Sequence, residues 1–355
     1  MIEVTVKQAL AFRLAGNNLT RRVDPMVAVA ACGIQEYPPG WGQVAIHART
    51  TGEPSARSTV LINAMRGAPH FVPVKERSIF TAALVPNDPE QLRALIGSAA
   101  AKHFDKAKVS VADGLERIEA AARDGLADGP LSFDDFHQAL RERLPKKLLP
   151  WCEPCQSHHV KHSVWQALGP LGVTMMPGRG ELALVKASAM PLSKARSELA
   201  RRFLRCFGPA THSQLASWGG TSPAHAKALL GAIADETCEV RLGSRKALVL
   251  ESDEKRLVKP PKAKGVRLLG GHDPWVAQPD RDSLVPDKAL RKRMFPALAR
   301  PGVVLVDGQI RGLWKARKKG ETLRIELDWI GPKADVEREA RAVAKRRGAK
   351  DVALA

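Results

Sequence analysis

The chain has 355 residues, 44% of them apolar, and its 56 Lys and Arg exceed 37 Asp and Glu to give a formal net charge of +19. This length exceeds one ordinary hydrophobic core and predicts several domains. No apolar run approaches the roughly 20 residues that cross a bilayer, which excludes a membrane-spanning helix. The charge indicates a polyanionic partner, and we expect nucleic acid. Five cysteines, an odd number, argue against a disulfide framework and favour a cytoplasmic location.

The first 78 residues are expected to form one domain of helices followed by paired strands. Apolar spacing predicts the helices, and β-rich runs predict the strands. Asp24 followed by Pro25 is a favourable helix start, because Asp caps the helix and proline suits its first turn. The expected elements are helices near 6–14, 25–34 and 41–49 and strands near 58–65 and 69–74.

Two later segments, residues 115–140 and 197–220, repeat one pattern. Each has an amphipathic helix, then Gly-Pro and an apolar residue, then a hydroxyl residue (Ser132 or Thr211) suited to cap a second helix. A third helical stretch follows each, near 158–168 and 222–234, and then alternating residues around a glycine turn, at 171–185 and 238–250. Three helices and a hairpin make a winged helix, whose third helix enters the major groove of DNA.

The C-terminal part changes character after a basic, proline-containing linker at 259–265. Residues 302–330 predict short strands with tight glycine turns, and 334–347 predicts a final helix. Asp273-Pro274-Trp275 predicts a strand-ending turn with a buried Trp275, and the alternative is that Asp273 serves the catalytic site if the C-terminal domain folds back on the first domain. The expected fold class is α+β, with three tandem winged-helix domains before a small C-terminal β-barrel. The expected domains are 1–78, 79–190 with a helical insertion, 191–258 and 259–355.

Taken together, these segments resemble the winged-helix DNA glycosylases of the AlkZ and YcaQ type, which excise alkylated bases and unhook DNA crosslinks. The resemblance extends over nearly the whole chain. Four stretches in the family's order carry it: MRGAPHFVP (65–73), RRFLRCFGPATHSQLASWGG (201–220), LLGGHDPWV (268–276) and VLVDGQIRGLWK (304–315). It implies a monomer that binds double-stranded DNA, with no membrane attachment. The implied reaction is hydrolytic excision of cationic alkylated purines, or unhooking of crosslinks, with no metal or cofactor.

The family's catalytic signature is Gln-x-Gln, or Gln-x-Asp in one branch, closing a helix of the first winged helix with an Arg downstream. In this chain GIQEY corresponds to that context and matches half of the motif: Gln35 takes the first position, Tyr37 stands where the family has Gln or Asp, and Arg49 follows. The resemblance therefore implies a catalytic set of Gln35, Tyr37 and the adjacent Glu36. On a helix Glu36 would point about 100° away from Tyr37, but it would reach the site if the helix ended at Gly33.

The chemistry explains why an amide suffices at this place. A purine alkylated at N7 or N3 carries positive charge, so its glycosidic bond is already weak and the leaving base needs little acid assistance. The enzyme must orient a water near C1′ and stabilise the developing sugar cation. Gln35 would orient water through its carbonyl oxygen, whereas tyrosine, with a reference pKa around 10, is a poor base near neutral pH.

Tyr37 thus favours an alternative function, a non-catalytic winged-helix DNA-binding protein that acts as a regulator or recognises damage. Such a regulator would normally be a dimer, because paired half-sites mirror two-fold symmetry.

Basic residues outside the signature are candidates for DNA contact. Arg66 and His70 flank the first predicted hairpin and are expected to contact phosphates or the lesion. Lys315 and Lys318 belong to a predicted basic turn, 315–319, and are expected to face phosphates. The alternatives are ordinary surface residues for the first pair and a solvated loop for the second.

A cluster of cysteines and histidines lies between the predicted second and third helices of the middle domain. Cys152 and Cys155 form a Cys-x-x-Cys pair, and His158 and His162 would share one helix face at i, i+4. Zinc chemistry is one interpretation, although the spacing is tighter than in ordinary two-Cys, two-His sites. The other is the start of a helix whose histidines face phosphate. The functional prediction accordingly includes no metal.

Overall fold

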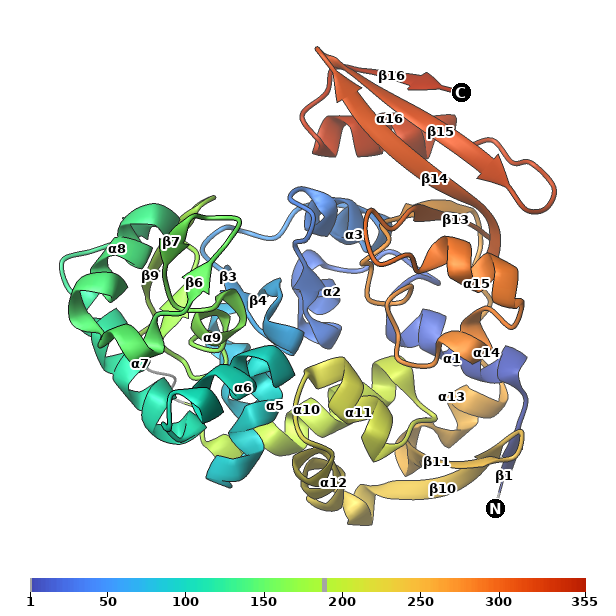
Figure 1. Ribbon diagram of the computed structural model, residues 1–355. Helices are drawn as coiled ribbons and strands as arrows, with labels where there is room; N and C mark the ends of the chain where they lie inside the picture. Colours follow the sequence, from blue (N-terminus) through green and yellow to red (C-terminus); the bar gives the residue numbers. More distant parts are fainter. Residues whose placement is uncertain (1, 187–189) are drawn as a thin grey trace. The chain divides into compact units, whose positions relative to one another are not determined.

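The protein is described by a computed structural model that covers residues 2–186 and 190–355 (Figure 1). It mixes helices and strands, as expected. The chain divides into two compact units. Unit 1 comprises Met1–Ser55, Ala200–Gln214 and Ile233–Ala355, and unit 2 comprises Ala56–Leu199 and Leu215–Ala232. Within the described residues, no helix is long and apolar enough to cross a bilayer.

The N-terminal helices of unit 1 begin where local capping residues predict. Thr5 caps α1 (Val6–Gly16) in a capping box with Gln8. Asp24 accepts a 2.8 Å hydrogen bond from Met26 N and begins α2 (Pro25–Cys32), which confirms the predicted start. Gly33, with φ of 68°, ends α2 earlier than expected, because this backbone conformation favours glycine. The strand β2 (Ile34–Gln35) and the helix α3 (Trp41–Arg49) follow.

A three-stranded sheet in unit 1 joins the chain's start to its later part. The strand β1 (Ile2–Val4) pairs in parallel with β10 (Thr237–Leu242), which forms the predicted hairpin with β11 (Arg245–Leu250). Ala210 forms an isolated bridge with Leu248 on β11. The helices that precede and follow this hairpin in the chain are α10 (Leu192–Phe207), α11 (His212–Gly219), α12 (Pro223–Gly231) and α13 (Glu254–Val258).

The C-terminal region of unit 1 is an open five-stranded sheet, consistent with half of the predicted barrel. Its strands lie in chain order, so β12 and β16 form the two edges. The helix α16 (Glu337–Arg346) covers one face and packs Ala340 and Val343 against Leu323 and Ile325 (Figure 1). The strands are β12 (Val266–Leu269), β13 (Gly302–Val306), β14 (Gln309–Lys319), β15 (Thr322–Trp329) and β16 (Asp351–Leu354), and the helices between β12 and β13 are α14 (Arg281–Leu284) and α15 (Lys288–Met294).

The predicted basic turn at 315–319 is wrong, because these residues belong to β14. Lys315 pairs with Glu326 and Lys319 with Thr322 on β15, and the turn comes at Gly320, where φ is 57°. Lys315, Arg317 and Lys319 are therefore alternate residues on one exposed face of the hairpin.

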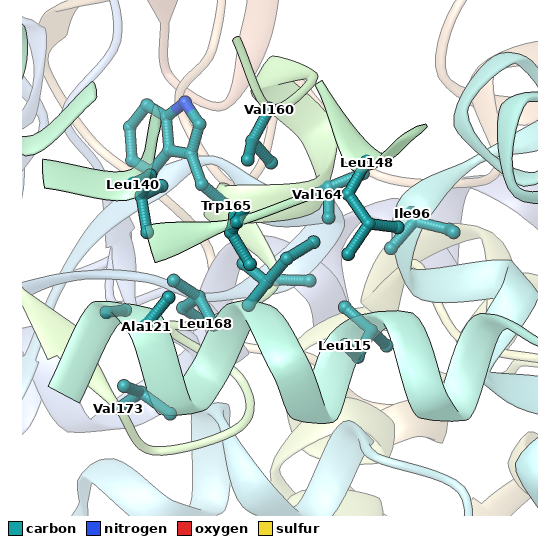
Figure 2. Packing of buried hydrophobic residues seen from close by; sticks show 14 of the residues in the cluster. Ile96, Leu115, Ala121, Leu140, Leu148, Val160, Val164, Trp165, Leu168 and Val173 are labelled. Carbon is teal, nitrogen blue, oxygen red and sulfur yellow. The ribbon is translucent and has the colours of Figure 1, made fainter. Parts of the chain in front are cut away.

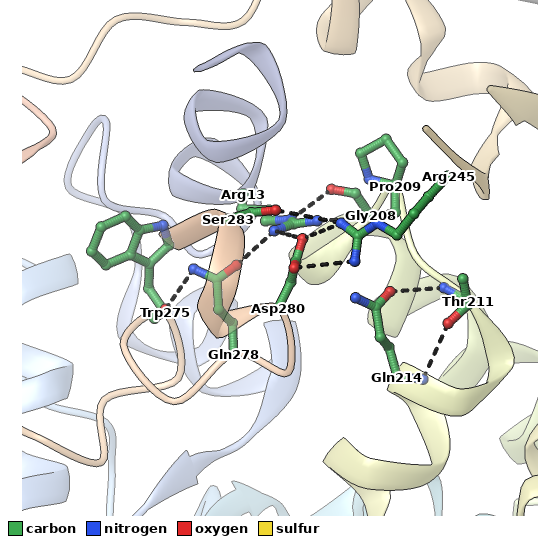
Figure 3. Close-up of polar contacts among 10 residues, drawn as sticks. All are labelled: Arg13, Gly208, Pro209, Thr211, Gln214, Arg245, Trp275, Gln278, Asp280 and Ser283. Carbon is green, nitrogen blue, oxygen red and sulfur yellow. Dashed lines mark hydrogen bonds and ion pairs between the residues drawn. The ribbon is translucent and has the colours of Figure 1, made fainter. Parts of the chain in front are cut away.

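A buried ion pair fastens α1 to two loops of unit 1 (Figure 3). The Arg13 side chain is fully buried and donates to Asp280 Oδ2 at 3.0 Å and to the carbonyl oxygens of Gly208 (3.1 Å) and Pro209 (3.0 Å). Arg245 donates to the same carboxylate at 2.7 Å. Burial raises the pKa of Asp280, but the hydrogen bond from Arg245 and the charge of Arg13 outweigh burial and lower that pKa to about 2.

Unit 2 is built on an apolar core under α7 (Val111–Gly125) (Figure 2). On α7, Ala121 lies near Leu168 and Val173, and Leu115 lies farther along the helix toward Leu148 and Ile96. The predicted Ser132 cap is present, since its hydroxyl accepts from Asp135 N at 3.1 Å at the start of α8. Other helices of unit 2 are α4 (Arg77–Phe80), α5 (Arg93–Ile96), α6 (Ser98–Lys106), α8 (Phe133–Arg143) and α9 (His162–Gln166).

The strands of unit 2 include the first predicted hairpin, β3 (Thr59–Asn63) antiparallel to β4 (Pro69–Pro73). A second sheet has the order β5-β9-β8, formed by Leu131–Ser132, Glu181–Leu184 and Thr174–Met175. The predicted helix from 158 is wrong at its start. Residues Ser157–His158 form the strand β7 against β6 (Trp151–Cys152), and α9 begins only at His162.

Candidate functional site

Gln35 lies in the short segment between α2 and α3 in unit 1. Because Gly33 ends α2, the chain extends through Ile34, which is fully buried, and Gln35, which is 8% exposed. The Gln35 amide nitrogen lies 3.4 Å from Nδ1 of His272. This contact places the Gln35 amide against the His272 imidazole.

The Glu36 carboxylate caps the following helix. It accepts hydrogen bonds from Gly40 N at 2.5 Å and Gly42 N at 2.7 Å, at the start of α3. The first N–H groups of a helix lack partners within the helix, and its N-terminus attracts negative charge. The helix α2 does end before Gly33, which was the condition for Glu36 to reach the site. The Glu36 carboxylate instead binds the backbone N–H groups at the start of α3.

Tyr37 is the second side chain of this segment that contacts His272. Its ring meets the imidazole edge-on, with centroids 5.7 Å apart and planes at 78°. The side chain is 54% exposed, in contrast with Gln35. The buried Gln35 amide and the exposed Tyr37 phenol therefore both contact His272.

The downstream arginine of the signature, Arg49, pairs with Asp273. Its guanidinium donates to Asp273 Oδ2 at 2.6 Å and Oδ1 at 2.8 Å, and both side chains are at most 1% exposed. Burial lowers the pKa of Arg49, but the charge of Asp273 and its hydrogen bonds outweigh burial and raise that pKa. Trp275 is buried, as predicted, and its backbone N–H donates to Asp273 Oδ1 at 3.0 Å. The pair therefore anchors the turn that carries His272.

His272 is the site residue that sequence reasoning did not select. It lies in LLGGHDPWV, far along the chain from Gln35, and no local pattern marks it. The sequence feature that could have pointed to this segment is the neighbouring Asp273. An acidic residue in an apolar stretch is expected to be buried and to need a cationic partner.

The other predicted residues are placed separately. Arg66 and His70 belong to unit 2, where Arg66 is exposed with φ of 55° and donates to the Trp218 carbonyl oxygen. His70 is buried, and its Nδ1 donates to Ala68 O at 2.8 Å. Burial, assisted by the charge of Arg66, lowers the pKa of His70 to about 3, so this imidazole is neutral at physiological pH.

Lys315 and Lys318 lie on β14 in unit 1 and differ in their surroundings. Lys315 is exposed opposite Glu326. Lys318 donates from Nζ to the Gly348 carbonyl oxygen at 2.5 Å, just beyond the C-terminus of α16. The C-terminal end of a helix carries partial negative charge, which stabilises a cation at this position. The Lys318 side chain therefore has a structural contact.

Comparison with solved structures shows the fold. The Streptomyces sahachiroi DNA glycosylase AlkZ matches with a TM-score of 0.74 over all of both chains, at 23% sequence identity. A curated relative, the interstrand DNA cross-link repair glycosylase of Streptomyces sahachiroi, is 29% identical over 163 residues. That alignment covers 44% of this chain and 43% of the relative.

The family model "DNA glycosylase AlkZ-like" matches residues 47–347. The chain therefore belongs to the AlkZ-like DNA glycosylase family. This confirms the family resemblance drawn from the sequence. The matched residues begin after Gln35, Glu36 and Tyr37, so the role of these three rests on their geometry.

Proposed function

We propose that the chain is a monofunctional DNA glycosylase that binds duplex DNA, as a monomer, and releases cationic alkylated purines or unhooks crosslinks through such bases. One observation carries the proposal: in a DNA glycosylase family member, the buried Gln35 amide is held by His272 beside the exposed Tyr37. A neutral amide fits a reaction in which the substrate already supplies the positive charge.

The proposed reaction needs little from the protein besides positioning. The C1′–N bond breaks and its electrons move to the base, which neutralises the charge of the alkylated purine. A water oxygen then bonds to C1′ of the sugar cation and its proton passes to solvent. The carbonyl oxygen of Gln35 accepts a hydrogen bond from that water and directs its lone pair at C1′.

The neighbouring side chains take supporting roles in this proposal. Glu36 holds the segment through its bonds to Gly40 and Gly42, and so positions Gln35 instead of acting as the base. Tyr37 is exposed and aromatic, which suits contact with the face of an unstacked base. His272 orients both Gln35 and Tyr37.

We further propose that the four predicted domains are three winged helices and a half-barrel. In the second, α7, β5, α8, α9, β8 and β9 follow in chain order, and the sheet order β5-β9-β8 is that of a winged helix. In the third, Ala210 bridges Leu248 on β11, which pairs with β10, so the same strand order recurs. These features support α9 and α12 as the helices that face DNA grooves.

The DNA contacts proposed outside Gln35 differ in kind. Arg66 and Lys315 are exposed cations suited to phosphates. Lys318 lies at the end of α16 and would reach DNA only by giving up its Gly348 contact. His70 is neutral and buried, so it would act by shape and not by charge.

The proposal is tested by base release from duplexes carrying either one N7-methylguanine or one crosslink, with abasic sites scored by alkaline cleavage. We expect wild-type protein to act on at least one of them, and His272→Ala to slow release while DNA affinity is retained. Salt-sensitive binding without release from either duplex would instead indicate the non-catalytic DNA-binding alternative, which Tyr37 favours. Light scattering after size exclusion tests the monomer, and a stable dimer would count against the glycosylase.

A further inference from the structure

The β6–β7 hairpin of unit 2 brings two cysteine thiols together. Cys152 pairs with Ser157 across the hairpin, and Cys155 lies in the turn. Gln156 closes that turn: its N–H donates to Glu153 O at 3.3 Å and its φ is 47°. Both cysteines are thiols and not a disulfide. The hairpin therefore presents two sulfur ligands from a short turn.

His159 adds a nitrogen ligand to this pair. The two sulfur atoms and a ring nitrogen of His159 all lie within 4.8 Å of one another. His159 Nδ1 lies 2.7 Å from the Val160 carbonyl oxygen. A carbonyl only accepts, so Nδ1 carries the proton and Nε2 keeps its lone pair. His159 Nε2 is buried and has no hydrogen-bond partner among the described residues.

The geometry selects His159 over the histidine favoured by sequence spacing. His158 belongs to β7, where its Nδ1 contacts Leu149 O at 2.9 Å and its ring meets the exposed Trp151 at 5.3 Å. It shares no helix with His162, which begins α9, so the expected i, i+4 pair is absent. His137 on α8 lies beside His159 instead, with ring centroids 4.9 Å apart, and its Nδ1 is also buried without a partner among the described residues.

We propose that Cys152 Sγ, Cys155 Sγ and His159 Nε2 bind Zn²⁺. Thiolate and imidazole are the ligands that zinc prefers, in tetrahedral geometry. Bond lengths of about 2.3 Å to sulfur and 2.0–2.1 Å to nitrogen place tetrahedral ligand atoms about 3.6–3.8 Å apart. The three ligand atoms lie within 4.8 Å of one another, so each pair needs to approach by at most about 1 Å to reach these separations. His159 already has the outer hydrogen bond that fixes a metal-binding tautomer.

The metal would have a structural role, independent of the proposed reaction. The hairpin lies in the chain between α8 and α9, and α9 carries Val164 and Trp165 of the unit 2 core. A zinc ion would fix the segment that leads into α9. Its loss would loosen that segment without touching Gln35.

The test uses full-length protein produced with zinc and dialysed against metal-free buffer, with metal measured by mass spectrometry. We expect one zinc per chain in wild type, and background levels in Cys152→Ser and His159→Ala. The matched controls are Cys238→Ser and His158→Ala, which we expect to retain zinc. Circular dichroism checks that each variant is folded.

A second measurement keeps the proposal testable if a variant fails to fold. Wild-type protein stripped of zinc and titrated with Co²⁺ should show a sulfur-to-cobalt charge-transfer band and the intense visible bands of tetrahedral cobalt. Absence of both zinc and these bands in wild type would overturn the proposal. So would a Cys152–Cys155 disulfide in protein alkylated under non-reducing conditions, or metal loss in His158→Ala with retention in His159→Ala.

Discussion

Replacement of Asp273 by Asn is expected to destabilise unit 1 strongly. The carboxylate neutralises Arg49, whose guanidinium is 1% exposed and also donates to Asn17 O (2.8 Å) and Ala45 O (2.8 Å). The variant would keep a side chain of the same shape but would leave a buried positive charge without its counterion. The asparagine side chain would also place an amide N–H against the Arg49 guanidinium, which can only donate hydrogen bonds.

The magnitude follows from the burial of both partners. Removal of one member of a buried ion pair costs about 3–5 kcal/mol of unfolding free energy, because the remaining charge stays desolvated. At about 2–4 °C per kcal/mol for a domain of roughly 150–250 residues, Tm should fall by about 6–20 °C. After this change a single side-chain oxygen would have to accept from both Arg49 and the Trp275 backbone N–H, so the turn that carries His272 should loosen as well.

Urea denaturation followed by tryptophan fluorescence measures the effect, since Trp275 is 2% exposed next to the pair. The matched control is Asp328→Asn, whose ion pair with Arg293 is at least half exposed and should contribute at most about 1 kcal/mol. The double variant Arg49→Met, Asp273→Leu should recover most of the loss, because it removes both charges. A loss in Asp273→Asn no larger than in the control, or a double variant less stable than the single one, would refute this reasoning.

Three further predictions follow from other contacts. Glu36→Ala should cost about 0.5–2 kcal/mol of unfolding free energy, as loss of a helix cap does, and chemical denaturation checks this value. The pKa of Asp280 is lowered to about 2, so its stabilising contribution is present above the unfolded pKa of about 3.9 and is lost as pH falls towards 2. The stability of Asp280→Asn should therefore depend less on pH in that window, by about 2 kcal/mol, and acid titration of both proteins would show no difference if the pairing is wrong. Lys315→Ala combined with Arg317→Ala should reduce the salt dependence of DNA binding by a slope of about 2, and an unchanged slope would place the phosphates elsewhere.

Local contacts made parts of the fold predictable from sequence. The starts of α2 and α8 depend on Asp24 and Ser132, each of which accepts from a backbone N–H two or three residues later. The β10–β11 hairpin was predictable for the same reason, from alternation around a short turn. The boundaries of the four domains stay predictions.

The rest depends on contacts between distant residues. His272 meets Gln35 across more than 200 residues, and no spacing rule connects them. The run of charges at 315–319 suggested a turn, because Lys318 interrupts the alternation of charged and apolar residues that indicates a strand. The Lys318 side chain contacts Gly348 at the end of α16, a contact that the local sequence does not reveal. His159 replaces His158 in the cysteine cluster because the hairpin register, and not a helix, sets their directions.

The proposed role of Gln35 in positioning water for base release can be measured by single-turnover kinetics. The single-turnover rate of release from an N7-methylguanine duplex, at saturating enzyme, is compared for wild type, Gln35→Ala and the control Gln43→Ala on the neighbouring helix α3. We expect release by wild type and by Gln43→Ala, and a large loss of rate in Gln35→Ala with DNA affinity unchanged. Equal rates in wild type and Gln35→Ala would contradict it and would place the catalytic group on another residue.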